Sequence, residues 1–522
     1  MTRKRGHGGH PAFGMTVSRL VNLAGVICLI LAAALGQPWV GGEAAPVQTL
    51  TLAQATDVDT WDPFGDNTDT IINVKRNVYE TLTTRDDQLR LVPLLAAGWQ
   101  QTNPTTWRFT LRRNVTFHDG SPMTAQDVQY SIMHQLDPAH KLPCTSWIAT
   151  ISTVDVVNPF TVDIHTTAPD GILPARLSFC AFIVPSKLVQ AHGLPWLAEH
   201  PTGTGPFRFV SWQRDQGSTL ERSTTYWGKP ARPAMVRFLS IPETSSRISA
   251  LLAGQIDVAA GLSPDLLPRL KQDPKVKVQV VHNDRVYFVI LNAHVAPFDN
   301  RSVRQAMNYA VNVQAIVDFL FKDYATRTAS ICGSMWDGCN SKQTPYRYDP
   351  KKARELLAAA GFPNGFQTTL AMSPQRPTAS VDVSQSIALE LKQVGVTAKI
   401  SSLEWGNLVT DWLQARSPMY YMSFGSPVLA LDDIIGAYFD PARRALWYTP
   451  PQNMIELART ALETGDLAKR AELYRQYLSL MKDEAPWLFL WTLDDITGVS
   501  TAVTGFVPRS DEMWDITGAT KQ

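Results

Sequence analysis

The chain has 522 residues, more than one hydrophobic core can organise, so we expect two or three domains. Apolar residues make up 44%, as in globular proteins, and 48 basic residues nearly balance 47 acidic ones. A charge balance this even gives no argument for binding nucleic acid or an anionic membrane.

Residues 1–44 have the pattern of a targeting segment. Four basic residues come first: Arg3, Lys4, Arg5 and Arg19. The apolar run 20–36 follows, then small residues near Ala44, and a run of 17 residues is short for a spanning helix. We predict a cleavable secretory signal ending close to Ala44, and a periplasmic or otherwise extracytoplasmic protein. An uncleaved N-terminal anchor is the alternative, while Cys28, which follows Ile27 inside the run, is a poor lipidation site.

Removing the signal leaves 44 basic and 46 acidic residues, a net charge of about −2, and four cysteines. An even number of cysteines in an exported chain favours two disulfides. Cys332 and Cys339 flank the short loop GSMWDG, so we predict that they are bonded to each other. We pair Cys144 with Cys180 only because they are the two cysteines left after the first pair is assigned. No further ligands lie close to these cysteines in the sequence, which disfavours a zinc site.

The first elements alternate between strand and helix. The stretch VQTLTLAQ, 47–54, alternates apolar and polar residues like a strand, and the polar loop 56–70 follows it. The stretch IINVKRNVYETL, 71–82, is expected to be helical, and WRFTLR, 107–112, is expected to be a strand.

The stretch TFHDGSPMTAQDVQYSI, 116–132, places His118 beside Asp119 and so resembles part of an active site. The dipeptide Asp-Gly that begins at Asp119 is typical of a turn. Thr124 and Asp127 have the spacing of a helix capping box. We therefore interpret this stretch as a scaffold that joins a strand to a helix, and not as a catalytic site.

Later elements continue the alternation. The stretch 298–312 has an N-cap at Asp299 or Asn300 and an apolar stripe at helical spacing, and 348–362 has Asp349 as its cap. A long amphipathic helix is expected to start near Leu467 and to be followed by the buried strand APWLFLW. Alternating strands and helices indicate α/β layers.

Sequence motifs of common enzymes are missing from the chain. The stretch PTGTGPF, 201–207, resembles a phosphate loop, but no Lys follows it and Pro206 lacks a free N–H. No nucleophile elbow and no zinc-protease motif appears. The histidines are scattered without metal-ligand spacing. We therefore expect no catalytic site, no resident metal and no cofactor.

Seven segments, each weak alone, occur in an order that is specific. They are VYETLTTRDDQLRLVPLLAAGWQ, TWRFTLRRNVTFHDGSPMTAQDV, HPTGTGPFRFVSW, TTYWGKPARP, ALLAGQIDV, APFDNRSVRQAMNYAVN and YRYDPKKARELLAAAGF. In this order, behind a secretion signal, the chain resembles the peptide, opine and nickel class of extracytoplasmic solute-binding proteins of ABC importers, bacterial extracellular solute-binding protein family 5. The resemblance implies an α/β, two-lobed periplasmic-binding-protein fold with an inserted subdomain and a ligand cleft between the lobes.

The resemblance also implies domain boundaries. Lobe one would comprise 45–80, 200–290 and 486–522, with the inserted subdomain at 81–199 and lobe two at 291–485. The chain would cross between the lobes near Leu291 and near Pro486. Closure about such crossings is hinge motion around a ligand.

The loop 60–70 and a Trp-bearing helix supply the first candidate ligand contacts. The resemblance places this loop at the cleft, so we expect contacts from Phe64, Asn67 and Thr68, with a solvated turn as the alternative. Trp405 and Trp412 are seven residues apart on one helix face. Trp405 is the candidate, because Trp412 is better explained by packing within its own lobe.

The stretch 419–439 supplies the remaining candidates, which are Phe424, Ser426 and Asp433. Peptide-binding relatives carry an Asp here that pairs with the ligand's α-ammonium, but that position falls near Ser426 and Pro427, where this chain has no carboxylate. A buried ammonium without a partner is costly, which puts free-amine peptides in doubt. Asp432 or Asp433 could substitute from a shifted register, or could cap the following helix.

The expected function is capture of a peptide-like or other amphipathic small solute and its delivery to an ABC permease in the cytoplasmic membrane. The protein would act as a monomer and bind no nucleic acid. A metal-chelate ligand stays open, because part of the family binds nickel complexes. A secreted peptide chaperone or chemosensory binding module on the same fold is the alternative, and a secreted hydrolase is less favoured.

Overall fold

The computed structural model describes residues 49–66, 68–333, 335–336, 338–339, 343–374, 376–440, 447–464 and 466–522. Residues 48–522 form one compact unit. The expected signal segment 1–44, its Cys28 and the candidate Asn67 lie outside the described residues. Among the helices that are described, none is both long and apolar enough to cross a membrane.

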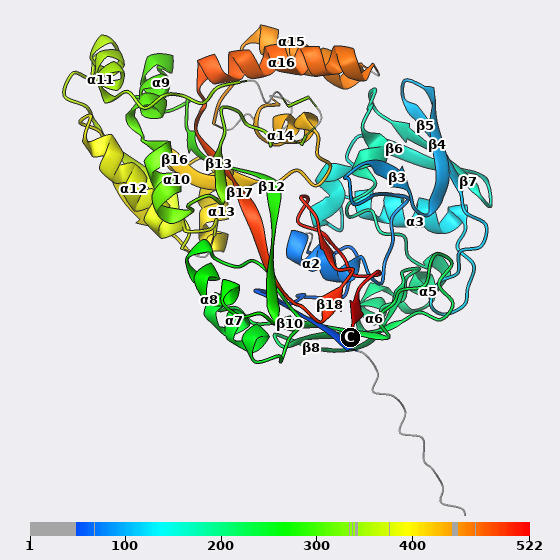
Figure 1. Ribbon diagram of the computed structural model, residues 1–522. Coiled ribbons are helices and arrows are strands. Elements are labelled where there is room, and N and C mark those ends of the chain that lie inside the picture. The colour runs from blue at the N-terminus through cyan, green and yellow to red at the C-terminus, as the bar shows by residue number, and fades with distance from the viewer. Residues whose placement is uncertain are drawn as a thin grey trace, which may run out of the picture. The chain divides into compact units, whose positions relative to one another are not determined.

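A mixed sheet of eleven strands organises the unit (Figure 1). Its order is β15-β14-β16-β12-β17-β11-β1-β10-β9-β8, and β13 also pairs with β17. The strands are β1 (Thr49–Gln54), β8 (Phe207–Gln213), β9 (Gly217–Arg222), β10 (Met235–Ser240), β11 (Val258–Ala259), β12 (Val276–Leu291), β13 (Ala325–Arg327), β14 (Gln367–Met372), β15 (Thr397–Ser402), β16 (Met419–Phe424) and β17 (Trp487–Ser500). Segments far apart in sequence therefore share one sheet.

Strands β12 and β17 lie antiparallel through the middle of this sheet, as Figure 1 shows. Val276 pairs with Ser500 near one end and Ile290 with Trp487 near the other. The apolar ends of both strands are buried, and β17 confirms the strand expected at APWLFLW. The pairing shifts register between His282 and Val286, so the intervening residues leave the ladder.

A second sheet, of four strands in the order β4-β5-β7-β6, has its own core. Its strands are β4 (Ala96–Asn103), β5 (Thr106–Leu111), β6 (Ile151–Asn158) and β7 (Thr161–Thr166), and β2 (Thr83–Arg85) pairs with β3 (Leu91–Pro93) beside it. The helix α3 (Ala125–Leu136) packs here. Asp127 Oδ2 accepts hydrogen bonds from the backbone N–H and the hydroxyl of Thr124, which confirms the expected capping pair.

The remaining helices surround both sheets. They are α2 (Asp69–Lys75), α4 (Leu173–Arg176), α5 (Ser186–His192), α6 (Leu194–Glu199), α7 (Thr244–Leu252), α8 (Leu267–Lys271), α9 (Arg301–Ala310), α10 (Val313–Leu320), α11 (Pro350–Ala359), α12 (Ser380–Lys392), α13 (Trp405–Leu413), α14 (Leu431–Tyr438), α15 (Gln452–Glu463) and α16 (Leu467–Glu484). The N-caps expected at Asn300 and Asp349 are confirmed, since both side chains accept backbone N–H bonds.

The helix expected over 71–82 is shorter than the sequence indicated, because α2 ends at Lys75. The Asn77 side-chain amide donates to the carbonyls of Asn73 and Val74, which a continuing helix would use itself. The following backbone then runs against the glycine-rich segment 201–207. A Cβ on Gly203 would lie 2.1 Å from the Val78 carbonyl oxygen, so this contact requires glycine.

The C-terminal residues fold back over the unit as two short hairpin pairs. Strand β18 (Val503–Thr504) pairs with β21 (Thr520–Lys521), and β19 (Val507–Pro508) pairs with β20 (Trp514–Asp515). These pairs hold the loop 509–513 near α2. The lobe boundaries expected from the sequence stay a prediction, because residues 48–522 form a single unit here.

Candidate functional site

Arg285 occupies a narrow crevice where three distant segments meet. It lies in the irregular stretch of β12, and its Nε and Nη2 donate to the two carboxylate oxygens of Glu512 at 2.7 and 2.8 Å. Its Nη2 also donates to Asp69 Oδ2 at 2.5 Å, at the start of α2. The bidentate pair with Glu512 is the strong geometry for an arginine and a carboxylate. Arg285 therefore joins β12, α2 and the C-terminal loop.

The two carboxylates beside Arg285 titrate differently. Burial alone would raise the pKa of Glu512, but the charge and hydrogen bonds of Arg285 lower that pKa to about 2. Burial and the neighbouring Glu512 charge raise the pKa of Asp69 well above its usual value. Burial and Glu512 also raise the pKa of Asp495, on β17, to about 7. Glu512 in the crevice is therefore firmly ionised, whereas Asp69 in the crevice and Asp495 on the neighbouring strand hold protons more easily.

Glu512 is held in a backbone conformation that favours glycine. Its φ is +62°, and residues other than glycine rarely adopt this region. The Asn73 side chain stabilises the loop, because its amide donates to the Glu512 carbonyl at 2.6 Å and its oxygen accepts from Trp514 N. Strained backbone of this kind occurs often at binding sites.

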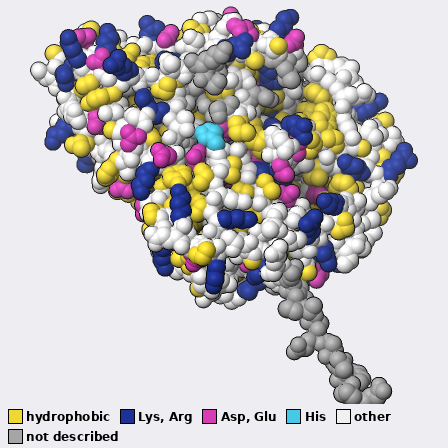
Figure 2. All heavy atoms as spheres, viewed as in Figure 1, with side chains coloured by type: hydrophobic (Ala, Val, Ile, Leu, Met, Phe, Trp, Pro, Cys, Tyr) yellow, Lys and Arg dark blue, Asp and Glu magenta, His cyan; other side chains and the backbone are white. Residues whose placement is uncertain are grey.

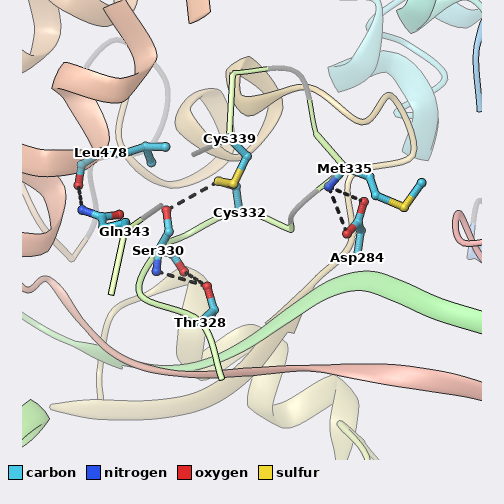
Figure 3. The surroundings of a disulfide bond; sticks show 8 residues. All are labelled: Asp284, Thr328, Ser330, Cys332, Met335, Cys339, Gln343 and Leu478. Carbon is cyan, nitrogen blue, oxygen red and sulfur yellow. Dashed lines mark hydrogen bonds between the residues drawn. A yellow bond between two sulfur atoms is a disulfide. The ribbon is translucent and has the colours of Figure 1, made fainter. Parts of the chain in front are cut away.

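The Cys332–Cys339 disulfide closes a loop beside the crevice, and Figure 3 shows this bond with Met335 and Asp284 nearby. The bond forms as expected, with an S–S distance of 2.01 Å. Within the closed loop, Met335 N donates to the carboxylate of Asp284, 3.1 Å from Oδ2. Trp336 follows and lines the crevice with Asp284. The other expected bond, Cys144–Cys180, is also present, within the core beside α3.

Of the candidates from the sequence, Ser426 lines this crevice, and Phe424 packs against its lining residue Trp336. Phe424, at the end of β16, is half-buried and its ring lies 6.1 Å from that of Trp336. Ser426 is buried, and its hydroxyl donates to Asp433 Oδ2 at 2.9 Å and accepts from Ala430 N. The pair Ser426–Asp433 therefore stabilises the start of α14.

Asp432, the other acidic residue weighed from the sequence, already has partners. Its carboxylate pairs with the Arg470 guanidinium and accepts a hydrogen bond from the Tyr474 hydroxyl. All three side chains are buried. Breaking a buried ion pair is costly, so Asp432 is unsuited to anchor a solute ammonium.

The loop 60–70 places its candidates apart from one another. Phe64 is 0% exposed and lies in the core, with its ring 5.1 Å from that of His134, so it has no surface for a solute in this conformation. The Phe64 ring is buried because Lys75 Nζ donates to the Asp62 carbonyl and holds the loop against the core. Thr68 is half-buried at the N-cap of α2. It precedes Asp69 in the chain, so of the described candidates in this loop it is the one near the crevice.

Trp405 lies against an arginine that the sequence did not single out. The guanidinium carbon of Arg376 is 4.0 Å from the centre of the Trp405 ring, a cation–π contact. Burial and the charge of Arg285 lower the pKa of Arg376, and the charge of Asp69 raises it. Within the described part of the chain its guanidinium makes no side-chain hydrogen bond. Trp412, by contrast, stacks on Trp447 with ring centres 4.7 Å apart.

His118 has a structural role in this geometry. Its Nε2 donates to the Gly205 carbonyl at 2.9 Å, and its Nδ1 accepts from Gly203 N at 3.4 Å, which one neutral tautomer satisfies. Burial lowers its pKa to about 4. Asp119 Oδ1 accepts from the N–H and hydroxyl of Ser121 and closes the turn. Across the described residues, no group of three or more His, Cys, Asp or Glu side chains could hold a metal ion.

Sequence reasoning missed five residues at or near the crevice: Asp69, Arg285, Trp336, Arg376 and Glu512. Trp336 could have been found, because it lies between two cysteines that were expected to bond. The others carry no local signal, since Arg285 contacts residues 216 and 227 positions away. Basic and acidic side chains are interspersed over the face of the molecule that Figure 2 shows.

Comparison with known proteins gives a family and a fold. The family model described as "Bacterial extracellular solute-binding proteins, family 5 Middle" matches residues 90–445. The "Glutathione-binding protein GsiB" of Pectobacterium atrosepticum is 28% identical over 482 residues, 90% of this chain and 93% of that protein.

Two solved structures have the same fold. The "ABC transporter-associated periplasmic binding protein DppA from Helicobacter pylori in complex with peptide STSA" superposes with a TM-score of 0.80 at 23% identity, over 91% of this chain and 98% of that chain. NikZ from Campylobacter jejuni in complex with Ni(L-His) has a TM-score of 0.79 at 23% identity, over 91% and 100%. The fold expected from the sequence, two-lobed and mixed α/β, is confirmed.

Proposed function

Because this chain belongs to the bacterial extracellular solute-binding proteins of family 5, we propose that it captures a peptide-like or other amphipathic small solute for an ABC importer. It is exported by its N-terminal segment, acts as a monomer outside the cytoplasmic membrane and delivers the solute to a membrane permease. It binds the solute reversibly and breaks no covalent bond. The observation that carries the proposal is the crevice at Arg285, where three distant segments meet Trp336 and Phe424 packs against Trp336.

The solute class follows from the groups that the crevice offers. Aromatic rings supply apolar contact, worth about 1 kcal/mol beyond buried area for a well-placed pair. Arg376 supplies a guanidinium that, among the described residues, stacks on the face of the Trp405 ring. Its N–H donors therefore suit a solute carboxylate. No carboxylate stands at Ser426 or Pro427 to take an α-ammonium. A peptide-like solute bound through its carboxylate and apolar groups fits this set.

Capture works by closure about the two crossings between lobes. Leu291 N donates to the Pro486 carbonyl at 3.0 Å, so the two crossings are joined to each other. A solute that contacts both sides of the crevice stabilises the closed form by its differential affinity for it. Asp69, Arg285 and Glu512 all lie in the proposed lobe one, whereas Trp336 and Ser426 lie in lobe two, so opening would separate these two sides of the crevice.

Native mass spectrometry of protein purified from its own host tests the proposal. We expect a complex with one small solute, which is released intact when the protein is unfolded. Purified protein loaded with that solute should stimulate the ATPase of its permease, which a chaperone or chemosensory module would not do. Release of a chemically altered solute, or no binding of any solute from host extract, glutathione or short peptides, would contradict it.

A further inference from the structure

A cavity of about 360 Å³ adjoins the crevice. Its walls come from the end of α2, from residues 80–87 and 178–182, and from the C-terminal residues 509–517. Pro427 and Asp511 line both the cavity and the crevice, so the two spaces are neighbours. A solute held in the crevice could therefore extend an arm into the cavity.

Arg76 lines this cavity and is poorly satisfied. It is half-buried at the C-cap of α2, and its one side-chain hydrogen bond within the described residues is a long one, from Nη2 to Thr84 Oγ1 at 3.4 Å. No described carboxylate lies within ion-pair distance of it. Burial and the like charge of Arg509 lower its pKa to about 10. A guanidinium has five donors, so most of them are available for an anion.

Two of the acidic residues on the same walls, Glu80 and Asp511, bond to other groups. Glu80 accepts from Thr204 and Trp227 on Oε2 and from Tyr226 on Oε1. Asp511 pairs with Arg509, 3.0 Å from Nε to Oδ1. These carboxylates leave Arg76 without a direct partner, and their charges would repel a phosphate, which carries nearly two negative charges. A carboxylate carries only one negative charge, so these residues would repel it less than a phosphate.

We propose that this cavity is a subsite for a carboxylate-bearing arm of the solute and that Arg76 is the charge partner of that carboxylate. The inference rests on the proposed capture of a peptide-like solute and adds that the solute carries an acidic side chain or a second carboxylate. Phe179, Phe182 and Met513 on the walls contact the apolar part of the arm. Arginine and carboxylate form a strong, planar pair where water is excluded.

Isothermal titration calorimetry with two pairs of tripeptides tests this subsite. The pairs are Ala-Ala-Glu against Ala-Ala-Gln, and Glu-Ala-Ala against Gln-Ala-Ala, so that only one charge differs within a pair. We expect the Glu peptide of at least one pair to bind about tenfold more tightly than its Gln partner. Arg76→Gln should remove this preference and leave the Gln peptide unchanged, and Arg76→Lys should keep part of it.

Arg459→Gln is the matched control, because Arg459 is 65% exposed on its side chain, pairs with Glu463, and neither residue lines the cavity. It should keep the preference. Equal affinity within both pairs, or an equal loss for both members in Arg76→Gln, would overturn the subsite while leaving solute capture intact. If no peptide binds the wild-type protein, the proposed solute class fails as well. Two of these measurements use only the wild-type protein, so they hold even if a variant fails to fold: the preference for the Glu peptide, and a crystal structure with the tighter peptide bound. A bound carboxylate placed away from Arg76 in that structure would overturn the proposal.

Discussion

Glu80 shows how burial sets the titration of a single residue. It is 4% exposed, and burial raises its pKa from 4.5 to about 7 against the effect of its three hydrogen bonds. Because the folded-state pKa is the higher one, the folded protein binds more protons at Glu80 between these values. Its contribution to stability is therefore full below about pH 4.5 and is lost as the pH rises through 7.

The variant Glu80→Gln tests this titration. Since Gln does not ionise, the stability of the variant relative to wild type should rise by on the order of 3 kcal/mol between pH 4 and pH 8. His118, whose pKa is lowered to about 4, gives the opposite slope but is present in both proteins and cancels. Urea unfolding at several pH values gives both curves. Parallel curves would show that Glu80 stays ionised in the fold.

The missing carboxylate at Ser426 and Pro427 leads to a second prediction for single residues. Calorimetry with short peptides that have either a free or an acetylated N-terminus should give affinities within about threefold, less than the tenfold change of a lost ion pair. The reason is that Asp432 is paired with Arg470, and Asp433 is bonded to Ser426. Binding of the free-amine peptide alone, abolished by Asp433→Asn, would show that Asp433 is an ammonium anchor and that this interpretation is wrong.

At the scale of elements, the sequence predicted what is encoded locally. The caps at Thr124, Asn300 and Asp349, the strand at 107–112 and the bonded pair Cys332–Cys339 each depend on residues close together in the chain. Helix α2 was overestimated because Asn77 and the packing of segment 201–207 end it, and the second of these is a long-range contact. Tertiary context overrides local pattern in such places.

The candidate site was less predictable than the fold for the same reason. The irregular stretch of β12 that turns Arg285 toward Glu512 is a property of its pairing with β17, which periodicity does not reveal. Phe64 was expected at the cleft, but Lys75 binds the loop backbone and places the ring in the core. Charged residues that meet only in the folded chain leave no spacing signal.

The disulfide loop allows a prediction for one element. Replacing Cys332 and Cys339 with Ser should lower the unfolding free energy by about 2–3 kcal/mol on the chain-entropy model. It should also weaken solute binding, because the loop would no longer hold Trp336 at the crevice. Replacing Cys144 and Cys180 is the comparison for stability and for the crevice, because neither residue lines the crevice and Trp336 should stay in place. Peptides without an acidic side chain are used for this comparison, because Cys180 lies between Phe179 and Phe182 of the cavity wall. Unchanged affinity in the first variant would remove any role of the loop in binding.

At the scale of the whole molecule, closure depends on the long strands β12 and β17 and on the segments that meet at Arg285. β12 and β17 extend through the sheet from one core to another, so movement about their ends changes the distance between α2 and β16. Arg285 bonds to both Asp69 and Glu512 in the conformation described here, which leaves the crevice narrow. A solute can enter only after this lobe-one side of the crevice separates from the lobe-two side that carries Trp336 and Ser426, so the unliganded protein is expected to be more open.

Small-angle X-ray scattering with and without saturating solute tests the central claim, capture by closure, most directly. The solute is the one identified in protein from the native host, and residues 48–522 are used so that the N-terminal segment does not contribute. We expect a smaller radius of gyration with the solute, and return to the larger value after dialysis. Superimposable curves at a solute concentration that calorimetry shows to be saturating would contradict capture by hinge closure.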